Sequence, residues 1–331
     1  YKRQVFKVGQ RIGDHLKIPR SIKGATFDAV ASSLPELLVA MFAVIFFNSF
    51  EVGIGTIAGS ALFNLLVIPG IAVLVTPVVF RVHRRVITRD ALFYVMSAFL
   101  LVVITVYFKT WGMVIAILLL AGYLLYLRTI TKHVKKDHEE SKSKHKNVNI
   151  RKEVWTAAGT VILIGVATYF LTEASIHLAA AINISPVIVA FILTAAATSV
   201  PDTVISVVNA KKGDIDDAAS NVFGSNTFDI LVGLGLPLLI FNLISGPVQI
   251  EFANFEILFG LLGATIVVLL FLAEDHILEK SRAIAMLVIY GVFIAYVVLL
   301  ALNPGESFVP KIEVDSSSLT FFDSSSITKQ N

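Results

Sequence analysis

Long runs without charged residues are the feature that most restricts what this chain can fold into. Six uncharged runs cover 52–80, 91–108, 111–127, 154–172, 257–273 and 283–302. Three more runs each contain a single acid: Glu36 in 29–50, Asp202 in 186–213 and Asp229 in 218–250. Each run is close to the ~20 residues that a membrane-spanning helix requires. The alternating pattern of a membrane barrel is absent from these runs, so the sequence predicts about nine helical spans.

The composition agrees with a membrane protein. Hydrophobic residues make up 56% of the 331 residues and charged residues only 15%, against roughly 45–50% apolar residues in ordinary globular domains. The mean hydropathy is +0.80. The predicted fold class is therefore all-α and polytopic.

The basic residues predict the orientation of the spans. If successive spans alternate in direction, five segments fall on one face of the membrane, and they contain 24 of the 27 Lys and Arg residues. These segments are 1–24, 81–90, 128–152, 211–217 and 274–282. Because basic residues accumulate in cytoplasmic loops, this face is expected to be cytoplasmic, with the chain crossing the cell membrane many times.

The same topology divides the chain into four parts. We expect an N-terminal half over 1–127, a basic cytoplasmic loop over 128–152, and a C-terminal half over 153–302. The Ser-rich segment 303–331 is expected to be a flexible tail on the opposite face. The basic loop has the composition of a solvated segment, and its histidines lack the spacing of a tetrahedral metal site.

The two halves contain similar sequences. A shift of 166 positions aligns "IPRSIKGATFDAVASSLPE" (18–36) with "ISPVIVAFILTAAATSVPD" (184–202). The identical positions in the first segment are Ile18, Ile22, Ala29, Ala31, Ser33 and Pro35, and Glu36 aligns with Asp202. A shift of 165 aligns "GSALFNLLVIPG" (59–70) with "GSNTFDILVGLG" (224–235). These alignments indicate an internal repeat.

The two copies enter the membrane from opposite faces, so the predicted repeats are inverted. Inverted repeats are typical of transporters whose substrate site lies near mid-membrane, where the copies meet. A span at 154–182 precedes the second motif, whereas its counterpart in the first half would begin before Tyr1. We therefore expect five helices in each repeat and ten spans in the intact protein, with the first span truncated here.

Pro35 and Pro201 each interrupt a predicted span beside an acid. Proline has no N–H, so the carbonyls of Ala31 and Ala197 lose their helical hydrogen bonds. A bare carbonyl in hydrocarbon costs several kcal/mol unless a partner satisfies it. A hard cation is such a partner, since calcium binds six to eight oxygen ligands. The alternative is a simple structural kink.

Hydroxyl and amide side chains accompany the acids at helical spacing. The candidate ligands with side-chain oxygens are Ser32, Ser33, Glu36, Ser60, Asn64, Thr198, Ser199, Asp202, Ser225 and Asp229. Because the set offers oxygen without sulfur or imidazole, it favours sodium, potassium or calcium over zinc or copper. The hydroxyls, and Gly55 with Gly59, have an alternative role in helix packing. Three acids in the membrane interior are harder to explain by packing, because each is costly there.

At these motifs the sequence resembles the calcium/cation antiporter superfamily, the sodium/calcium exchangers with paired alpha repeats. The resemblance covers about residues 5–302 and is strongest over 29–70 and 195–237. The second motif, "TSVPDTVISVVNAKKGDIDDAASNVFGSNTFDILVGLGLP", looks most like the potassium-dependent sodium/calcium exchangers.

The resemblance implies roles for individual residues. Glu36 and Asp202 would be the central calcium ligands, and Asp229 would match the acid that confers potassium dependence. Ser32, Ser33, Thr198 and Ser199 would contribute to calcium and sodium sites, which Ser60, Asn64, Ser225 and Asp229 would complete. The carbonyls of Ala29 and Ala195 would bind sodium. Ala31 and Ala197 stand where the family usually has Gly, a departure that bears on ion selectivity.

Charge balance suggests a mechanism. With all three acids ionised, the site carries three negative charges, which are costly in the membrane unless cations neutralise them. Three sodium ions would balance them, and so would one calcium with one potassium, or one calcium with a protonated Asp229. Because sodium and calcium would share ligands, they would exclude each other. We therefore expect a secondary active antiporter in which inward sodium flow drives calcium outward.

Other functions remain open at this stage. A proton-coupled calcium/cation exchanger is the nearest alternative, and a passive cation channel is a weaker one. The GxGD signature of intramembrane aspartyl proteases is missing, as are HExxH and GxSxG, so we expect no enzyme activity. The expected ligands are calcium and sodium, with potassium and protons as further candidates, in a lipid bilayer. No permanently bound cofactor, nucleic acid or obligatory oligomer is expected.

Overall fold

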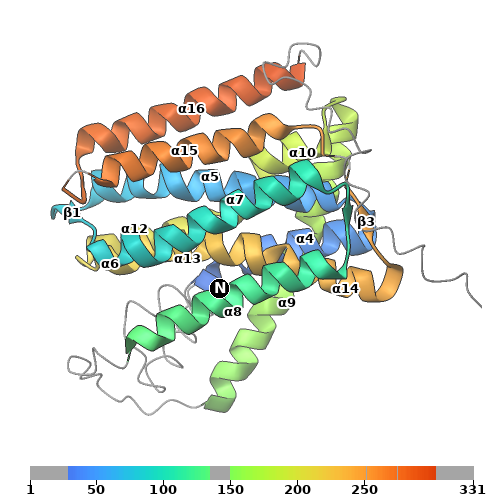
Figure 1. Cartoon of the computed structure of the whole chain (residues 1–331), viewed down its shortest axis with the longest axis horizontal. Coiled ribbons are helices and arrows are strands. Elements are labelled where there is room, and N and C mark those ends of the chain that lie inside the picture. The colour runs from blue at the N-terminus through green and yellow to red at the C-terminus, as the bar shows by residue number, and fades with distance from the viewer. Residues whose placement is uncertain (1–28, 135–149, 251, 274, 303–331) are drawn as a thin grey trace, which may run out of the picture.

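The computed structural model describes residues 29–134, 150–250, 252–273 and 275–302. Nearly all of this part of the chain is helical (Figure 1). The first half contains α3 (Ala29–Ser32), α4 (Leu34–Phe47), α5 (Phe50–Val75), α6 (Arg84–Val86), the π-helical turn η2 (Ile87–Ala91), α7 (Leu92–Tyr107) and α8 (Met113–Val134). The second half contains α9 (Ile150–Ala181), α10 (Pro186–Val189), η3 (Ala190–Thr194), α11 (Ala195–Thr198), α12 (Val200–Lys211), α13 (Ile215–Phe228), η4 (Asp229–Gly233), α14 (Gly235–Ser245), α15 (Phe255–Ala273) and α16 (Lys280–Leu302).

The helices confirm a polytopic membrane protein. Among the described residues, seven helices are long and apolar enough to cross a membrane, and a pair of helices bent by 42° at Ser199 makes an eighth when it is counted as one span. The apolar helix α4 is shorter, with 14 residues. Each of the nine predicted runs coincides with one of these helices. The tenth span, expected upstream of residue 29, lies outside the described residues, as does the tail 303–331.

Several helix ends differ from the prediction. The segment 81–90 was predicted to be a loop, but a helix begins at Arg84 and continues through η2 into α7. Helices α8 and α9 also extend into both ends of the predicted loop 128–152. Hydropathy locates the apolar part of a helix, whereas the backbone hydrogen bonds continue through arginines and lysines, which favour helices.

Two short strand pairs join the halves at opposite ends of the molecule. Strand β1 (Phe80–Arg81) pairs antiparallel with β4 (Ile277–Leu278), and β2 (Thr110–Trp111) pairs with β3 (Val248–Gln249). Strand β1 follows α5, and β4 precedes α16. The alternating topology places both of these strands on the same face of the membrane. Strands β2 and β3 lie on the other face. The pairing therefore agrees with spans that alternate in direction and with two inverted repeats.

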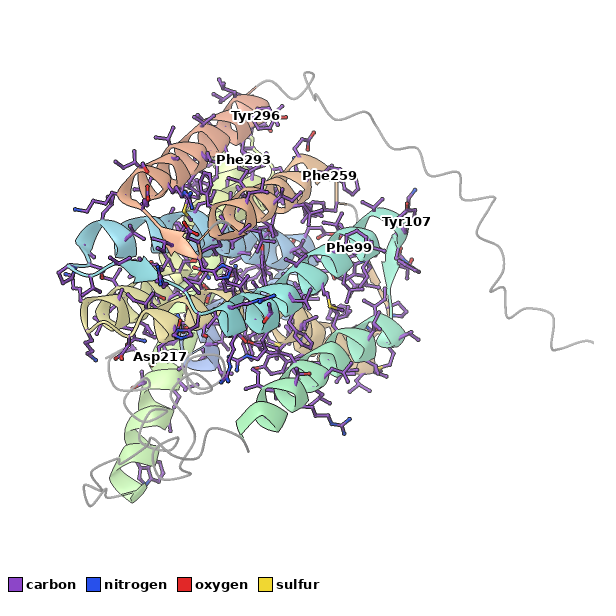
Figure 2. All side chains as sticks on the ribbon, turned by 60° about the vertical axis from the view of Figure 1, so that its left-hand side comes forward. Phe99, Tyr107, Asp217, Phe259, Phe293 and Tyr296 are labelled. Atoms are coloured by element: carbon purple, nitrogen blue, oxygen red, sulfur yellow. The ribbon has the colours of Figure 1, made fainter. Side chains whose placement is uncertain are left out.

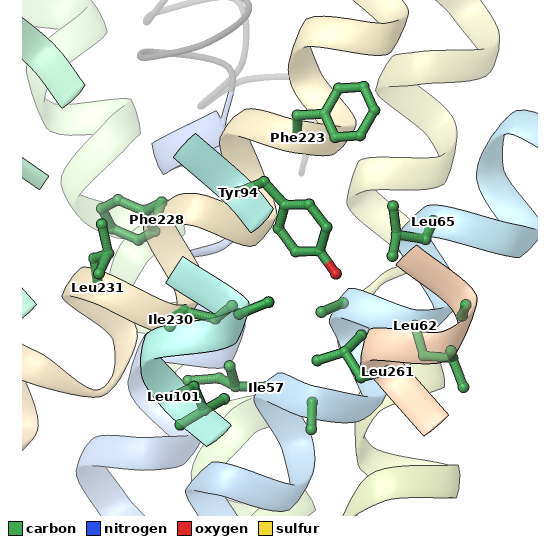
Figure 3. Packing of buried hydrophobic residues seen from close by; sticks show 14 of the residues in the cluster. Ile57, Leu62, Leu65, Tyr94, Leu101, Phe223, Phe228, Ile230, Leu231 and Leu261 are labelled. Carbon is green, nitrogen blue, oxygen red and sulfur yellow. The ribbon is translucent and has the colours of Figure 1, made fainter. Parts of the chain in front are cut away.

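Helix α5 lies at the centre of the fold. Its most apolar 18-residue window is 78% buried, against 17% for α9 and for α16. Ile57, Leu62 and Leu65 of this helix pack in the core with Tyr94 and Leu261 from both halves (Figure 3). By contrast, Phe99 is 60% exposed and faces outward (Figure 2). Large apolar side chains on the outside suit a surface in contact with lipid.

Two glycines allow α5 to approach the second repeat. A Cβ added at Gly59 would lie 2.1 Å from the carbonyl oxygen of Phe191, and one at Gly55 would lie 2.7 Å from that of Val187. Real Cβ atoms do not approach oxygen so closely, so these positions require glycine. The Gly55–Gly59 pair therefore has the packing role that small residues have between membrane helices.

Candidate cation site between the two repeats

Both proline-containing helices break in the same way. In the first repeat, α3 ends at Ser32 and α4 begins at Leu34, with Pro35 in its first turn. In the second, α11 ends at Thr198 and α12 begins at Val200, with Pro201 in its first turn. The interruption predicted at each proline is therefore present, at the serine two residues before it.

The backbone hydrogen bonds around the two breaks match closely. The amide of Ser33 donates to Ala29 at 2.9 Å, and the amide of Ser199 donates to Ala195 at 2.9 Å. After each break, the carbonyl of the same serine accepts the next helical bond, from Leu37 in one repeat and from Thr203 in the other. The prolines have no amide to donate to the intervening carbonyls of Ala31 and Ala197. Equivalent sequences thus produce equivalent breaks.

The predicted side chains are brought together in the interior. Glu36, Asp202 and Asp229 are completely buried, as are the hydroxyl and amide candidates Ser32, Ser33, Ser60, Asn64, Ser199 and Ser225. Thr198 is only 2% exposed. Glu36 interacts electrostatically with Asp202, and Asp229 interacts with both. The acids of the two repeats therefore share one buried region.

The hydroxyls connect the repeats in a crossed pattern. Ser60 donates to Glu36 of its own repeat at 3.2 Å and lies 2.8 Å from the hydroxyl of Ser199 in the other repeat. Ser225 donates to Asp202 of its own repeat at 2.7 Å and lies 3.2 Å from the hydroxyl of Ser32. Each matched serine thus bonds the acid of its own copy and a hydroxyl of the other copy.

Asn64 and Asp229 occupy matched positions but have different surroundings. The Nδ2 of Asn64 lies 2.9 Å from Asn226 Oδ1, with longer contacts of 3.4 Å to Ser60 and 3.5 Å to Asp202. Neither carboxylate oxygen of Asp229 has a partner in good hydrogen-bonding geometry among the described residues, although the hydroxyl of Ser33 lies near enough to stabilise its charge. The Asn64 amide is therefore fixed by hydrogen bonds from its nitrogen, whereas the Asp229 carboxylate is not fixed by such bonds.

Several other buried oxygens in this region also lack a hydrogen bond partner in the described structure. They are Glu36 Oε2, Ser33 Oγ, Asn64 Oδ1 and Asn221 Oδ1, in addition to both oxygens of Asp229. Buried polar atoms are normally hydrogen-bonded, so a cluster of unsatisfied ones requires an explanation such as a bound ion. These atoms are all acceptors that a hard cation could satisfy, and they come from both repeats.

Acidic side chains do not form a dense metal cluster. Over the described ranges, no group of three or more His, Asp or Glu side chains is arranged to hold a metal ion. A cation here would therefore be bound by carboxylates mixed with hydroxyl, amide and carbonyl oxygens. Such neutral oxygen ligands suit sodium, potassium and calcium, which bind oxygen and tolerate irregular geometry.

The carbonyls of Ala29 and Ala195 already accept two hydrogen bonds each. Besides the backbone amides, the hydroxyl of Ser32 donates to Ala29 at 3.1 Å, and that of Thr198 donates to Ala195 at 3.1 Å. For a cation to bind at either carbonyl, the hydroxyl would have to rotate away. Because a hydroxyl that donates its hydrogen keeps its oxygen lone pairs, the same side chain could also bind the ion through its oxygen.

Two residues of this region were not predicted from the sequence. Asn221 donates to Asp202 at 3.4 Å, and Asn226 donates to the carbonyl of Ala61 at 3.1 Å while it accepts from Asn64. Their matched positions in the first copy are Thr56 and Ala61. Because these residues differ between the copies, the internal repeat does not indicate them. Their spacing from Ser225 on the same helix was the signal available.

The architecture and this centre define a class of protein: a helical membrane protein with two inverted repeats and an acidic, oxygen-lined site between them. The sequence pattern of the family described as "Sodium/calcium exchanger protein" matches residues 3–132 and 152–299. The chain belongs to this family.

Individual relatives agree with the family. The chain is 27% identical over 241 residues to an uncharacterized membrane protein of Methanocaldococcus jannaschii, covering 72% of this chain and 77% of the relative. It is 26% identical to the inner membrane protein YrbG of Escherichia coli, covering 67% and 70% of the two chains. It is also 35% identical over 154 residues to sodium/potassium/calcium exchanger 1 of Bos taurus, covering 44% of this chain and 12% of that protein.

A solved structure has the same fold. The sodium-calcium exchanger NCX_Mj, soaked with 100 mM Na+ and 10 mM Sr2+, superposes with a TM-score of 0.64 at 23% sequence identity. The superposition covers 89% of this chain and 92% of NCX_Mj. The all-α fold of two inverted repeats predicted from the sequence is therefore confirmed.

Proposed function

We propose that this chain exchanges sodium for calcium across a membrane by alternating access to the site between the repeats. The observation that carries the proposal is the cluster of buried, unsatisfied oxygens on Glu36, Ser33, Asn64 and Asp229. Membership of the sodium/calcium exchanger family supports sodium and calcium as the two ions. It does not favour the alternatives of proton-coupled exchange or a passive channel.

Competition for shared ligands would couple the two ions. Glu36 and Asp202 would bind calcium at the centre, assisted by the hydroxyls of Ser60 and Ser225 that already bond them. Sodium ions would take the same oxygens, with the hydroxyls of Ser32, Ser33, Thr198 and Ser199 and the carbonyls of Ala29 and Ala195. Because carboxylates without cations are costly in this interior, the site would change its orientation only when it is loaded with one ion or the other.

The inverted repeats supply the two orientations. When two similar units are related by inversion, exchanging their conformations converts a site open to one face into a site open to the other. We propose that the face with the basic segments is cytoplasmic and that the protein resides in the cell membrane. In that orientation inward sodium flow would extrude calcium. The site forms within one chain, so the mechanism does not require an oligomer or a permanently bound cofactor.

Potassium is a further proposed ligand, at Asp229. This carboxylate is completely buried and has no partner in good hydrogen-bonding geometry among the described residues, so a monovalent cation there would neutralise it. The bovine sodium/potassium/calcium exchanger, which matches over part of the chain, supports this assignment.

Radiolabelled calcium uptake into proteoliposomes tests the function. Vesicles loaded with sodium and diluted into sodium-free medium are expected to accumulate calcium, and vesicles without a sodium gradient are not. The uptake should be measured with and without potassium and across pH. Calcium uptake that follows the pH gradient and ignores sodium would establish the proton-coupled alternative. Uptake driven by calcium alone would establish a channel.

A further inference from the structure

A second buried acid lies outside the proposed cation site. Asp90, in the turn η2 at the start of the span Arg84–Tyr107, is completely buried. It belongs to a segment that the sequence predicted to be a cytoplasmic loop. A buried carboxylate is costly unless it is paired and fully hydrogen-bonded, so its partners indicate what it holds in place.

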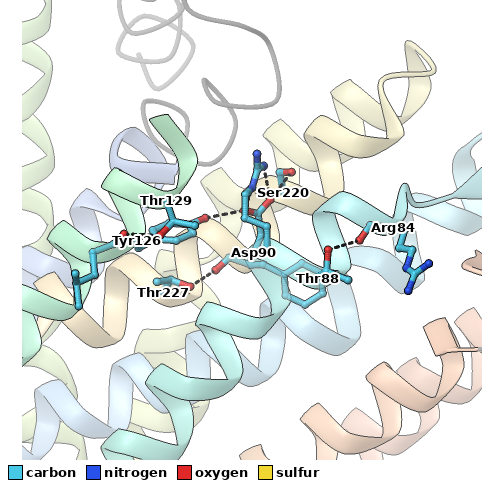
Figure 4. A network of polar contacts seen from close by, with 10 residues as sticks. Arg84, Thr88, Asp90, Tyr126, Thr129, Ser220 and Thr227 are labelled. Carbon is cyan, nitrogen blue, oxygen red and sulfur yellow. Dashed lines mark hydrogen bonds and ion pairs between the residues drawn. The ribbon is translucent and has the colours of Figure 1, made fainter. Parts of the chain in front are cut away.

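Asp90 accepts hydrogen bonds from three side chains (Figure 4). Arg89 donates twice, from Nε to Oδ1 at 2.7 Å and from Nη2 to Oδ2 at 2.9 Å. Ser220 donates to Oδ2 at 2.9 Å, and the hydroxyl of Tyr126 donates to Oδ1 at 3.3 Å. Arg89 balances the charge, and the two hydroxyls occupy the remaining acceptor positions. Such charge-assisted bonds are stronger than neutral ones.

These donors come from different parts of the fold. Tyr126 lies on α8 of the first half, and Ser220 lies on α13 of the second half. Asp90 therefore ties the N-terminal part of α13 to two helices of the other half.

Helix α13 carries the groups that bond Asp202. Ser220 directly precedes Asn221, whose Nδ2 donates to Asp202 Oδ1 at 3.4 Å. Ser225, about one turn further along, donates to the same oxygen at 2.7 Å. A small displacement of α13 would therefore change both contacts to this acid. A rigid helix is an effective way to transmit such a displacement.

The matched position on α5 has no side chain to make this contact. A shift of 165 places Gly55 opposite Ser220, and glycine has no side chain to donate. Gly55 instead lies against the backbone of Val187. The contact thus acts on only one of the two matched helices.

We propose that Asp90 is a positioning residue for ion binding, which holds α13 through Ser220 so that Asn221 and Ser225 reach Asp202. This inference rests on the proposed function, because it assigns Asp202 to the cation site. Loss of the contact should lower the apparent calcium affinity more than it lowers the maximum rate. Asp90 does not touch the ion, and its proposed effect is on the groups that bond Asp202.

The test compares single hydroxyl deletions. Calcium dependence of sodium-driven uptake is measured in proteoliposomes for Ser220→Ala, Tyr126→Phe and the control Ser97→Ala. Ser97 is nearly buried on α7, and its hydroxyl bonds the carbonyl of Phe93 in its own helix. Ser220→Ala is expected to raise the half-saturating calcium concentration by about three- to tenfold, within the range of coupling seen for residues that contact neither ligand. Tyr126→Phe should act in the same direction, and Ser97→Ala should match the wild type.

Combined variants distinguish positioning from general damage. In an Asn221→Ala background, Ser220→Ala should have a smaller effect, because part of its route to Asp202 has been removed. Asp90→Asn should show the largest increase in the half-saturating calcium concentration. If Asp90→Asn does not fold, Ser220→Ala still tests the proposal. A half-saturating concentration for Ser220→Ala equal to that of Ser97→Ala, in a protein whose wild type exchanges sodium for calcium, would overturn the inference alone. A wild type without sodium-driven uptake would overturn the proposed function as well.

Discussion

The two copies of the motif build nearly the same structure from different sequences. Both break at a serine before a proline, and both place a serine of the next helix against their own acid. They differ at the matched positions 64 and 229. Asn64 is neutral and donates to its neighbours, whereas Asp229 adds a carboxylate without a partner in good hydrogen-bonding geometry among the described residues.

The features that form the site are therefore distinct from the feature expected to set its ion selectivity. The features shared by the copies, namely the breaks, the hydroxyls and one acid each, create the oxygen-lined centre. The feature that differs places additional negative charge on the second copy's side. Ion selectivity is therefore expected to depend most on position 229, and transport itself on the shared acids.

Neutralising either shared acid should have the largest effect. Glu36→Gln and Asp202→Asn each remove one charge and leave the shape unchanged. Sodium-driven calcium uptake should fall at least about 100-fold in both, because a hard divalent cation depends on carboxylate ligands. Asp275→Asn is a matched control, since Asp275 is exposed in the turn between α15 and β4. If uptake by either variant resembled that of the control, that acid would not belong to the site.

Separating the copies should be nearly as damaging. Gly59→Ala introduces a Cβ 2.1 Å from the carbonyl oxygen of Phe191 and 2.7 Å from the Cβ of Ala195. We expect a loss of stability of about 1–3 kcal/mol or more, as in other overpacked interiors, with little remaining uptake. Thermal unfolding in detergent measures the stability. Gly165→Ala is the control, because a Cβ there meets no atom within 4 Å.

A stability of Gly59→Ala equal to that of Gly165→Ala would contradict the close contact of α5 with the second repeat.

Making the copies alike should change selectivity more than transport. Asp229→Asn removes the additional charge, so any potassium requirement should disappear while sodium-driven calcium uptake continues. The double variant Asn64→Asp with Asp229→Asn moves the charge to the other copy and tests whether its position matters. Potassium dependence of uptake is the measurement. A requirement for potassium that is unchanged in Asp229→Asn would refute the role of this carboxylate.

Replacing one or the other of the two matched serines should change calcium affinity by amounts that differ only modestly. Ser225 donates to Asp202 at 2.7 Å, and Ser60 donates to Glu36 at 3.2 Å. Hydrogen bonds to charged groups contribute about 1.5–3 kcal/mol, and the shorter bond is expected to be the stronger one. Ser225→Ala should therefore weaken calcium affinity more than Ser60→Ala. A larger loss for Ser60→Ala would reverse the order that these distances imply.

The sequence predicted much of the fold and of the candidate site for a physical reason. Membrane spans are long and apolar, prolines mark where they break, and acids within them are costly and are therefore usually functional. These signals located nine spans and the ten side chains with candidate oxygens, all of which the structure buries in one region. The repeat also predicted which positions would correspond.

Other features left no such signal. Asn221 and Asn226 contribute hydrogen bonds that depend on how the helices pack, and their matched positions are occupied by different residues. Asp90 lies next to several arginines, so hydropathy assigned it to a loop, although Arg89 and two hydroxyls allow it to be buried. Contacts between distant helices decide such cases, and local sequence patterns do not encode them.

The most direct test of the central claim is the position of a bound divalent cation. Crystals soaked with strontium, which scatters anomalously, would locate the ion in this protein. We expect one strong site between the repeats, with carboxylate oxygens of both Glu36 and Asp202 in its coordination shell at about 2.3–2.7 Å. An ion bound by the acid of only one repeat, or located away from both, would contradict the account.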